Sequence, residues 1–150
     1  MIRVPPTALI PIHNNGHWQY DKKMGSGVGF IYVIRDNVLR KLYLGKKLYR
    51  GHGKLNKGKE SNWKKYKSSS KTLALHFAER PMEEFDFICI GEYATKGGLA
   101  YAETWSLCYT DALTTDAWYN KMIGKISWNV TELVSIEHKK RLNDVINWRE

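Results

Sequence analysis

The sequence has little cysteine and proline and contains no long apolar run. Its 150 residues include two cysteines, Cys89 and Cys108, and four prolines. Two cysteines without metal-type spacing indicate neither a disulfide framework nor a zinc site, so we interpret both as reduced thiols of a cytoplasmic protein. No apolar stretch approaches the roughly 20 residues that a membrane-spanning helix needs, and the first residues lack the apolar core of a signal peptide. We therefore expect no membrane span and no secretion.

Acidic residues are scarce in one stretch of an otherwise highly charged chain. The formal net charge is +9. Residues 41–71 contain eleven lysines and arginines against a single acid, Glu60, so this segment carries +10 and the rest of the chain sums to −1. A dense cationic segment interleaved with aromatic residues is typical of a surface for a polyanion, most simply the phosphate backbone of a nucleic acid. A lysine-rich solvated loop is the alternative interpretation.

Length and hydrophobic content fit one folded domain. Hydrophobic residues make up 43% of the chain, which excludes wholesale disorder and suffices for one core. Residues 1–24 carry three prolines, an Asn-Asn-Gly sequence and no sustained periodicity, so we interpret them as an irregular N-terminal arm. We expect a single domain over residues 25–150, with a helical C-terminal extension over residues 122–150.

Two strand-like runs, residues 29–34 and 39–44, flank an Asp36-Asn37 pair and predict a β-hairpin. A connection with an even number of residues centred on that pair would place Tyr32 opposite Lys41, and Phe30 opposite Tyr43. Because side chains alternate along a strand, Tyr32, Lys41 and Tyr43 would then share one face.

The remaining pattern predicts helices around one further strand. Short helices are expected at residues 61–67, with Ser61 as N-cap, and at residues 73–79. Residues 85–93 alternate as a third strand, Gly97-Gly98 opens a helix over residues 99–112, and a last helix runs from Ser135 or Glu137 to about residue 148. We expect an α+β fold, in which helices flank a small, mostly antiparallel three-stranded sheet.

Four motifs in order resemble the GIY-YIG endonuclease superfamily. They are Phe30-Ile31-Tyr32, Tyr43-Leu44-Gly45, an acidic residue in a helix, Glu103, and Tyr119-Asn120. The resemblance covers residues 29–121, and the lysine-rich stretches after Gly45 and around Trp63 look like a phage-encoded branch related to homing endonucleases. Such a protein would act in the host cell cytoplasm. Members of the superfamily usually carry an arginine on the helix after the second motif, where this chain has none, so Arg50, Lys47 and Lys64 compete for that role.

The resemblance implies a metal-dependent DNA endonuclease that needs no small-molecule cofactor. It casts Tyr32 as the general base, Tyr43 as support for the attacking water or the scissile phosphate, and Glu103 as the ligand of Mg²⁺ (or Mn²⁺). Mg²⁺ often takes one or two carboxylates, with substrate phosphate completing its shell. A nearby cation, Lys41 or Lys46, would favour the phenolate of Tyr32.

Each of these assignments has a structural alternative. The two tyrosines could simply pack one face of the hairpin. Glu103 could be stabilised by a helix N-terminus or paired with a lysine. Asn120, which could bind phosphate or orient Glu103, could instead be a loop or capping residue.

DNA is the expected partner, and the contacts are expected from the cationic segment. The candidate DNA-binding residues are Lys41, Lys47, Arg50, His52, Lys54, Lys64, Lys65, Ser69 and Ser70. Such a set predicts low sequence specificity and a steep salt dependence. A nuclease for branched DNA in repair or recombination, and a non-catalytic DNA-binding protein, are the alternative functions. The target and the oligomeric state stay open.

Overall fold

A computed structural model describes residues 14–51, 58–124 and 129–147 of the chain. Its strands and helices are, in chain order, β1 (Gly29–Asp36), β2 (Lys41–Leu48), the 3-10 turn η1 (Trp63–Lys65), α1 (Lys71–Glu79), η2 (Met82–Glu84), β3 (Phe85–Tyr93), α2 (Lys96–Tyr109), η3 (Ala112–Thr114) and α3 (Ile136–Ile146). The strands form one antiparallel sheet in the order β2-β1-β3. The predicted α+β class and three-stranded sheet are confirmed.

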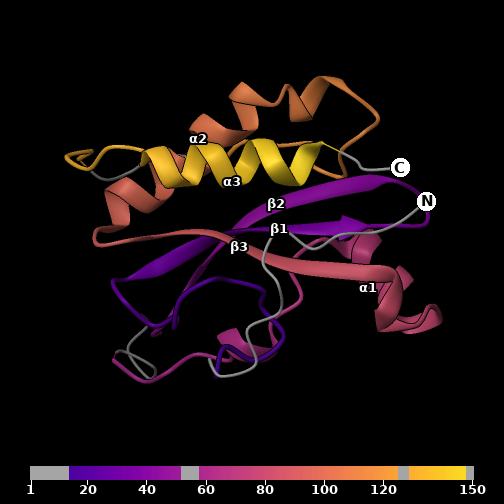
Figure 1. Ribbon diagram of the computed structural model, residues 1–150, viewed down its shortest axis with the longest axis horizontal. Helices are drawn as coiled ribbons and strands as arrows, with labels where there is room; N and C mark the ends of the chain where they lie inside the picture. Colours follow the sequence, from indigo (N-terminus) through magenta and orange to yellow (C-terminus); the bar gives the residue numbers. More distant parts are fainter. Residues whose placement is uncertain (1–13, 52–57, 125–128, 148–150) are drawn as a thin grey trace.

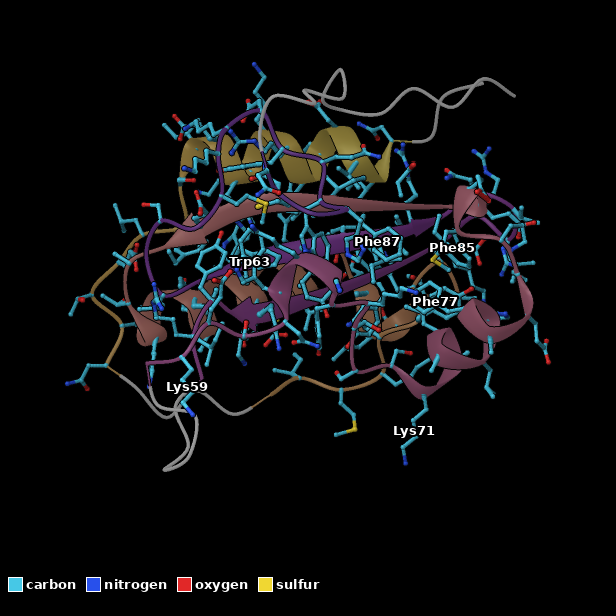
Figure 2. All side chains as sticks on the ribbon, turned by 90° about the horizontal axis from the view of Figure 1, so that it is seen from below. Lys59, Trp63, Lys71, Phe77, Phe85 and Phe87 are labelled. Carbon is cyan, nitrogen blue, oxygen red and sulfur yellow. The ribbon has the colours of Figure 1, made fainter. Side chains whose placement is uncertain are left out.

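The two faces of the sheet are packed differently, and side chains of the central strand β1 point to both of them (Figure 1). Ile31 and Val33 point to α2 and α3, which cover the side that we call the aliphatic face. Phe30, Tyr32 and Ile34 point the other way, because side chains alternate along a strand. That side, the aromatic face, is covered by residues 14–24, η1 and α1. Figure 2 looks onto it and shows Trp63, Phe77, Phe85 and Phe87 gathered there.

The predicted hairpin register is wrong by four residues. Tyr32 lies opposite Gly45, and Phe30 lies opposite Lys47, so β2 extends further toward the cationic segment than expected. The shift is an even number of residues, so Tyr32 and Tyr43 still share one face, as predicted.

The turn between β1 and β2 explains the error. It spans residues 37–40, and Oδ1 of Asp36 accepts hydrogen bonds from the backbone N–H groups of Val38 and Leu39, each at 3.0 Å. Arg40 closes the turn at φ 58°, in the left-handed region that favours glycine. Because no glycine marks this position, the sequence did not reveal the longer turn.

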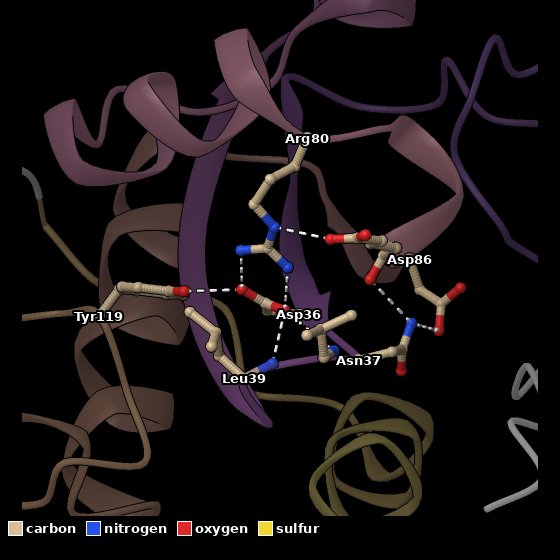
Figure 3. Close-up of polar contacts among 8 residues, drawn as sticks. Asp36, Asn37, Leu39, Arg80, Asp86 and Tyr119 are labelled. Carbon is tan, nitrogen blue, oxygen red and sulfur yellow. Dashed lines mark hydrogen bonds and ion pairs between the residues drawn. The ribbon is translucent and has the colours of Figure 1, made fainter.

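Asp36 also anchors α1 and the segment around residue 119 to the hairpin (Figure 3). Its fully buried carboxylate accepts two hydrogen bonds from Arg80, at 2.7 and 2.8 Å, and one from the hydroxyl of Tyr119, at 2.8 Å. Burial would raise the pKa of Asp36, but the hydrogen bonds from Arg80, Leu39 and Tyr119 hold it below its usual value.

Serine and threonine caps set the helix ends. Ser135, one of the two expected starts, caps α3, and Ser70 caps α1, which begins at Lys71, two residues earlier than expected. The helix α2 begins at Lys96 because Thr95 accepts a hydrogen bond from the N–H of Gly98, so the glycine pair lies inside the first turn. The helix predicted at residues 61–67 is a single 3-10 turn, because Ser61 donates its hydroxyl to the carbonyl of Leu48 instead of capping.

The described part of the N-terminal arm, residues 14–24, packs on the aromatic face without forming a helix. Trp18, Tyr20 and Met24 are buried, and Gln19 makes a parallel bridge with Ile88 of β3. The indole N–H of Trp18 donates to the carbonyl of Trp63 at 2.6 Å. Among the described residues, no helix has both the length and the apolar character that crossing a bilayer requires.

Candidate active site

The side chain of Tyr32, on β1, packs over the edge strand β2, where a glycine makes room for it. Gly45 is its direct partner in the register. A Cβ atom at Gly45 would lie 2.4 Å from the Tyr32 hydroxyl oxygen, so no larger residue fits without moving the phenol. Tyr43, two residues earlier on the same face, places its ring 6.3 Å from that of Tyr32. The second motif therefore supplies one phenol, that of Tyr43, and at Gly45 the space for the phenol of Tyr32.

A third tyrosine, Tyr66, completes the cluster and was missed in the sequence. Its ring lies 6.1 Å from that of Tyr32 and meets it edge-on, and Tyr66 contributes to the raised pKa of Tyr32. The ammonium of Lys47 lies 4.1 Å from the centre of the Tyr66 ring, a cation–π contact. Tyr66 follows two lysines in the cationic segment, and that aromatic interruption was the only signal that could have pointed to it.

The tyrosine hydroxyls are held in their neutral form. Burial raises the pKa of Tyr32 well above its usual value, and Tyr43, Tyr66 and Glu103 raise it further. Burial also raises the pKa of Tyr43, although its contact with the Ser69 hydroxyl opposes this. The two lysines expected beside Tyr32 are directed elsewhere: Lys41 lies over the ring of Tyr119, and Lys46 pairs with Glu103.

Glu103 reaches the tyrosine cluster from the opposite face of the sheet. It lies on α2, which packs on the aliphatic face, and its carboxylate accepts a hydrogen bond from the Lys46 ammonium at 3.1 Å. The side chain is 16% exposed, so it is not sealed in the core. Since its charge raises the pKa of both Tyr32 and Tyr43, it lies within electrostatic reach of both phenols. Lys46, the partner of Glu103, follows Gly45 on β2, so Glu103 and the phenols border the same part of this strand from its two faces.

Asn120 ends the backbone pairing along this edge. Residues 117–119 bond with the backbone of Leu42, and Asn120 then bonds both backbone groups of Leu44, at 2.7 and 2.9 Å. Both ends of its buried amide are engaged, so it acts as a structural cap of the segment. Lys46, the next residue whose backbone faces outward, has no such partner among the described residues. The edge of β2 is thus open beside Gly45.

The other candidate DNA-binding residues in the described part of the chain lie at the start of α1, in η1 and at the far end of β2. Ser70 caps α1, whereas Ser69 is exposed and its Oγ lies 3.5 Å from the Tyr43 hydroxyl. Lys65 is exposed in η1. Arg50 and Lys64 line a pocket at the far end of β2. His52 and Lys54 lie outside the described residues.

The donor set around Glu103 fits a hard divalent cation that is completed by substrate. In the described parts of the chain, no three histidine, cysteine, aspartate or glutamate side chains form a metal cluster. Glu103 is a single, partly exposed carboxylate beside a cationic surface. Mg²⁺ is commonly held by one or two carboxylates, water and substrate phosphates, so such a site does not need a protein-only cage.

The chain matches one family of known proteins. A family model described as "Putative endonuclease segE, GIY-YIG domain" matches residues 12–123. The match includes residues 12–24 of the arm, both tyrosine motifs, the cationic segment, Glu103 and Asn120. No curated protein and no solved structure matched the chain.

Proposed function

Because the chain belongs to the GIY-YIG family, a family of nucleases that hydrolyse phosphodiester bonds, and is a DNA endonuclease, we propose that it cuts DNA at the open edge of β2. The observation that carries this proposal is the convergence of groups from both faces. Tyr32, Tyr43 and Tyr66 come from the aromatic face, and Glu103 comes from the aliphatic face. Gly45 leaves room on β2 for the Tyr32 hydroxyl.

Tyr32 is the proposed general base, and Tyr43 is the proposed contact to the attacking water or the scissile phosphate. The raised pKa of Tyr32 keeps its proton on the hydroxyl oxygen at neutral pH, and makes the phenolate a strong base when it forms. Tyr43 is only half-buried, with its hydroxyl beside exposed Ser69, so it can meet a substrate phosphate. The ring of Tyr66 packs edge-on against that of Tyr32 and restricts its position.

Lys47 is the proposed cation of the site. Its ammonium lies over Tyr66, on the same face as Tyr32 and Tyr43, and burial lowers its pKa. A partly desolvated ammonium interacts more strongly with phosphate oxygens and with a forming phenolate than an exposed one does. Arg50 and Lys64, the other two candidates, belong to the far end of the strand.

Glu103 would hold Mg²⁺ or Mn²⁺, and Lys46 keeps its carboxylate turned toward the edge of β2. A bound ion would supply Lewis-acid stabilisation of charge on the phosphate and the leaving oxygen. The ion would share the carboxylate with Lys46, whose own side chain is 37% exposed and free to shift.

We further propose low sequence specificity. The final helix α3 buries His138, Leu142 and Val145 against the aliphatic face, so its apolar side serves the core. The contacts left for DNA are mostly lysine ammonium groups, which read phosphates rather than bases. A phage mobility function of the segE type is consistent with the matched description.

Cleavage of supercoiled plasmid tests the proposal. With Mg²⁺ or Mn²⁺, wild-type protein should give nicked or linear DNA, whereas Tyr32→Phe and Glu103→Gln should bind DNA but not cut it. Glu137→Gln, which alters an exposed acid in the first turn of α3, is the matched control and should cut normally. Normal cleavage by Tyr32→Phe and Glu103→Gln would refute these assignments. Tight binding by wild type without any cleavage would favour the non-catalytic alternative.

A further inference from the structure

A pocket of about 460 Å³ opens on the aromatic face at the far end of β2. Three cationic side chains, Lys23, Arg50 and Lys64, line it together with Glu60. Tyr49 and Trp63, both buried, form part of its wall. None of these residues belongs to the tyrosine and glutamate groups of the proposed active site.

The pocket is held open by contacts between segments far apart in the sequence. Glu92 of β3 accepts hydrogen bonds from the backbone N–H groups of Gly25 and Ser26, each at 2.9 Å, and from the hydroxyl of Tyr49. The backbone of His17 donates to the carbonyl of Lys64 at 3.2 Å. These contacts fix the N-terminal arm against η1 and the end of β2. A binding site that is already formed loses less conformational entropy when its ligand arrives.

The charges in the pocket favour an anion. Its one carboxylate, Glu60, accepts a hydrogen bond from the indole N–H of Trp63 at 3.0 Å. Arg50 uses one nitrogen to donate to the carbonyl of Gly58, at 3.1 Å, and its guanidinium carries further donors. Among the described residues, no ion pair involves Lys23 or Lys64. Concave walls with an excess of one charge concentrate the field, so a phosphate group is the favoured ligand chemistry.

An aromatic row links this pocket to the tyrosine cluster. The ring of Phe30 lies 6.1 Å from that of Tyr32 and 5.2 Å from that of Tyr49. Tyr49 lies four positions beyond Gly45, the partner of Tyr32, which corresponds to about 13 Å at a rise of about 3.3 Å per residue. The pocket and the active site therefore lie on one face, but too far apart for both to contact the same phosphate.

We propose that this pocket binds a backbone phosphate of the DNA substrate, away from the bond that is cut. The choice of DNA rests on the proposed function. Along a duplex, a separation of about 13 Å corresponds to about four base pairs, at about 3.4 Å per step. The pocket thus holds the substrate within one helical turn of the cleavage site and fixes its direction across the sheet.

Salt-dependent DNA binding tests the pocket independently of cleavage. A double variant, Lys23→Gln with Lys64→Gln, is compared with Lys139→Gln with Lys140→Gln, which removes the same charge from exposed positions on α3. The affinity for a 20-base-pair duplex is measured in EDTA over a salt series. The slope of log affinity against log salt should fall by about 1 to 2 in the pocket variant, since each phosphate contact contributes about 0.9. The α3 variant should change the slope by less than half as much.

Cleavage kinetics separate the pocket from the chemistry. At saturating DNA, the pocket variant should keep kcat within threefold of wild type, while KM rises at least tenfold. If wild type does not cut at all, the proposed function fails, but the salt slopes still decide the pocket. Equal slopes for the two double variants would overturn the pocket assignment. Lys23→Glu, a single reversal at an exposed residue, provides a second test if the double variant does not fold, and it should weaken duplex binding more than Lys139→Glu.

Small anions distinguish a polymer phosphate from a free one. Titration with inorganic phosphate and with dAMP should give only millimolar binding that weakens in the pocket variant. Micromolar binding of dAMP, lost in the pocket variant while its duplex affinity stays at the wild-type value, would overturn the proposal and assign the pocket to a free nucleotide.

Discussion

The two faces of the sheet differ in their side chains and in the segments that cover them. On the aliphatic face, α2 and α3 cover branched side chains, and even the polar His138 is fully buried, with its two ring nitrogens bonded to Tyr93 and Ser106 at 2.8 and 2.7 Å. On the aromatic face, irregular segments and the short helix α1 cover aromatic rings, tyrosine hydroxyls and lysines. We therefore propose that the aliphatic face mainly supplies the stability of the domain and the aromatic face its chemistry, with Glu103 as the link between them.

The largest effect should come from removing one hydroxyl on each face. Tyr32→Phe should lower kcat by about 10²- to 10⁴-fold, the usual contribution of a general base, with little change in stability. Tyr93→Phe should keep kcat within threefold and cost about 1–3 kcal/mol of stability, because the buried Nδ1 of His138 loses its partner. Single-turnover cleavage and urea unfolding measure the two quantities. If Tyr93→Phe lost activity and Tyr32→Phe lost stability, the division between the faces would be wrong.

The same pair of variants should differ in pH dependence. Because the pKa of Tyr32 is raised, only a small fraction is ionised at neutral pH, and the cleavage rate should increase as pH rises from 7 to 9. Tyr93→Phe should keep this increase, and the residual activity of Tyr32→Phe should lose it. A flat wild-type profile would exclude a phenolate base.

The next effect concerns the anchor of the aromatic face. Arg80→Met should destabilise the protein by about 3 kcal/mol, because it leaves the buried carboxylate of Asp36 without its cation. Hydrogen exchange should increase first in α1, whereas α2 and α3 stay protected. Arg80→Lys keeps the charge but not the paired geometry, so its stability should lie between that of wild type and that of Arg80→Met. Uniform loss of protection in all three helices would contradict separate contributions from the two faces.

A smaller effect is expected from adding one methyl group to either face. Gly45→Ala should lower kcat by about 100-fold, because the new Cβ displaces the Tyr32 hydroxyl. Gly91→Ala meets Nδ1 of His138 at 3.2 Å on the other face and should cost stability rather than activity. Measuring kcat and melting temperature for both variants separates the loss of activity from the loss of stability. An active Gly45→Ala protein would show that the position of Tyr32 does not matter.

The smallest effect is acid sensitivity of the aliphatic face. Burial, together with the positive charges of Arg141 and Lys139, lowers the pKa of His138 from 6.5 to about 3. The unfolded chain therefore binds this proton more readily, so the stabilisation is complete above pH 6.5 and is lost as pH falls toward 3. Between pH 7 and 5 the loss should be on the order of 1–2 kcal/mol, measured by urea unfolding. His138→Gln should be less stable at pH 7 but lose this part of the pH dependence. An unchanged pH profile would contradict the buried neutral imidazole.

The sequence predicted the elements of the fold well, because local patterns determine them. Runs of β-branched and aromatic residues identified β1 and β2, alternation identified β3, and Ser135 was one of the two expected starts of α3. The hairpin register was missed because the Asp36 side chain and the left-handed Arg40 close a four-residue turn that no glycine indicates.

The site was only partly predictable, because its geometry depends on contacts between distant segments. The motif spacing predicted that Tyr32 and Tyr43 share a face, and this is confirmed. The Lys46–Glu103 pair joins residues 57 positions apart, and the packing of Tyr66 against Tyr32 follows from the path of the cationic segment. No local pattern encodes either contact, so the roles of Tyr66 and Lys47 became visible only in the folded structure.

The account depends most on Tyr32 and Glu103 acting on one phosphate across the edge of β2. A double-mutant cycle with Tyr32→Phe and Glu103→Gln, read as single-turnover cleavage rates, tests this most directly. Residues that act as one catalytic unit are strongly non-additive, so the double variant should cut within about threefold of the slower single variant. If the two losses multiply, the two side chains act independently, and the common site at the strand edge is contradicted.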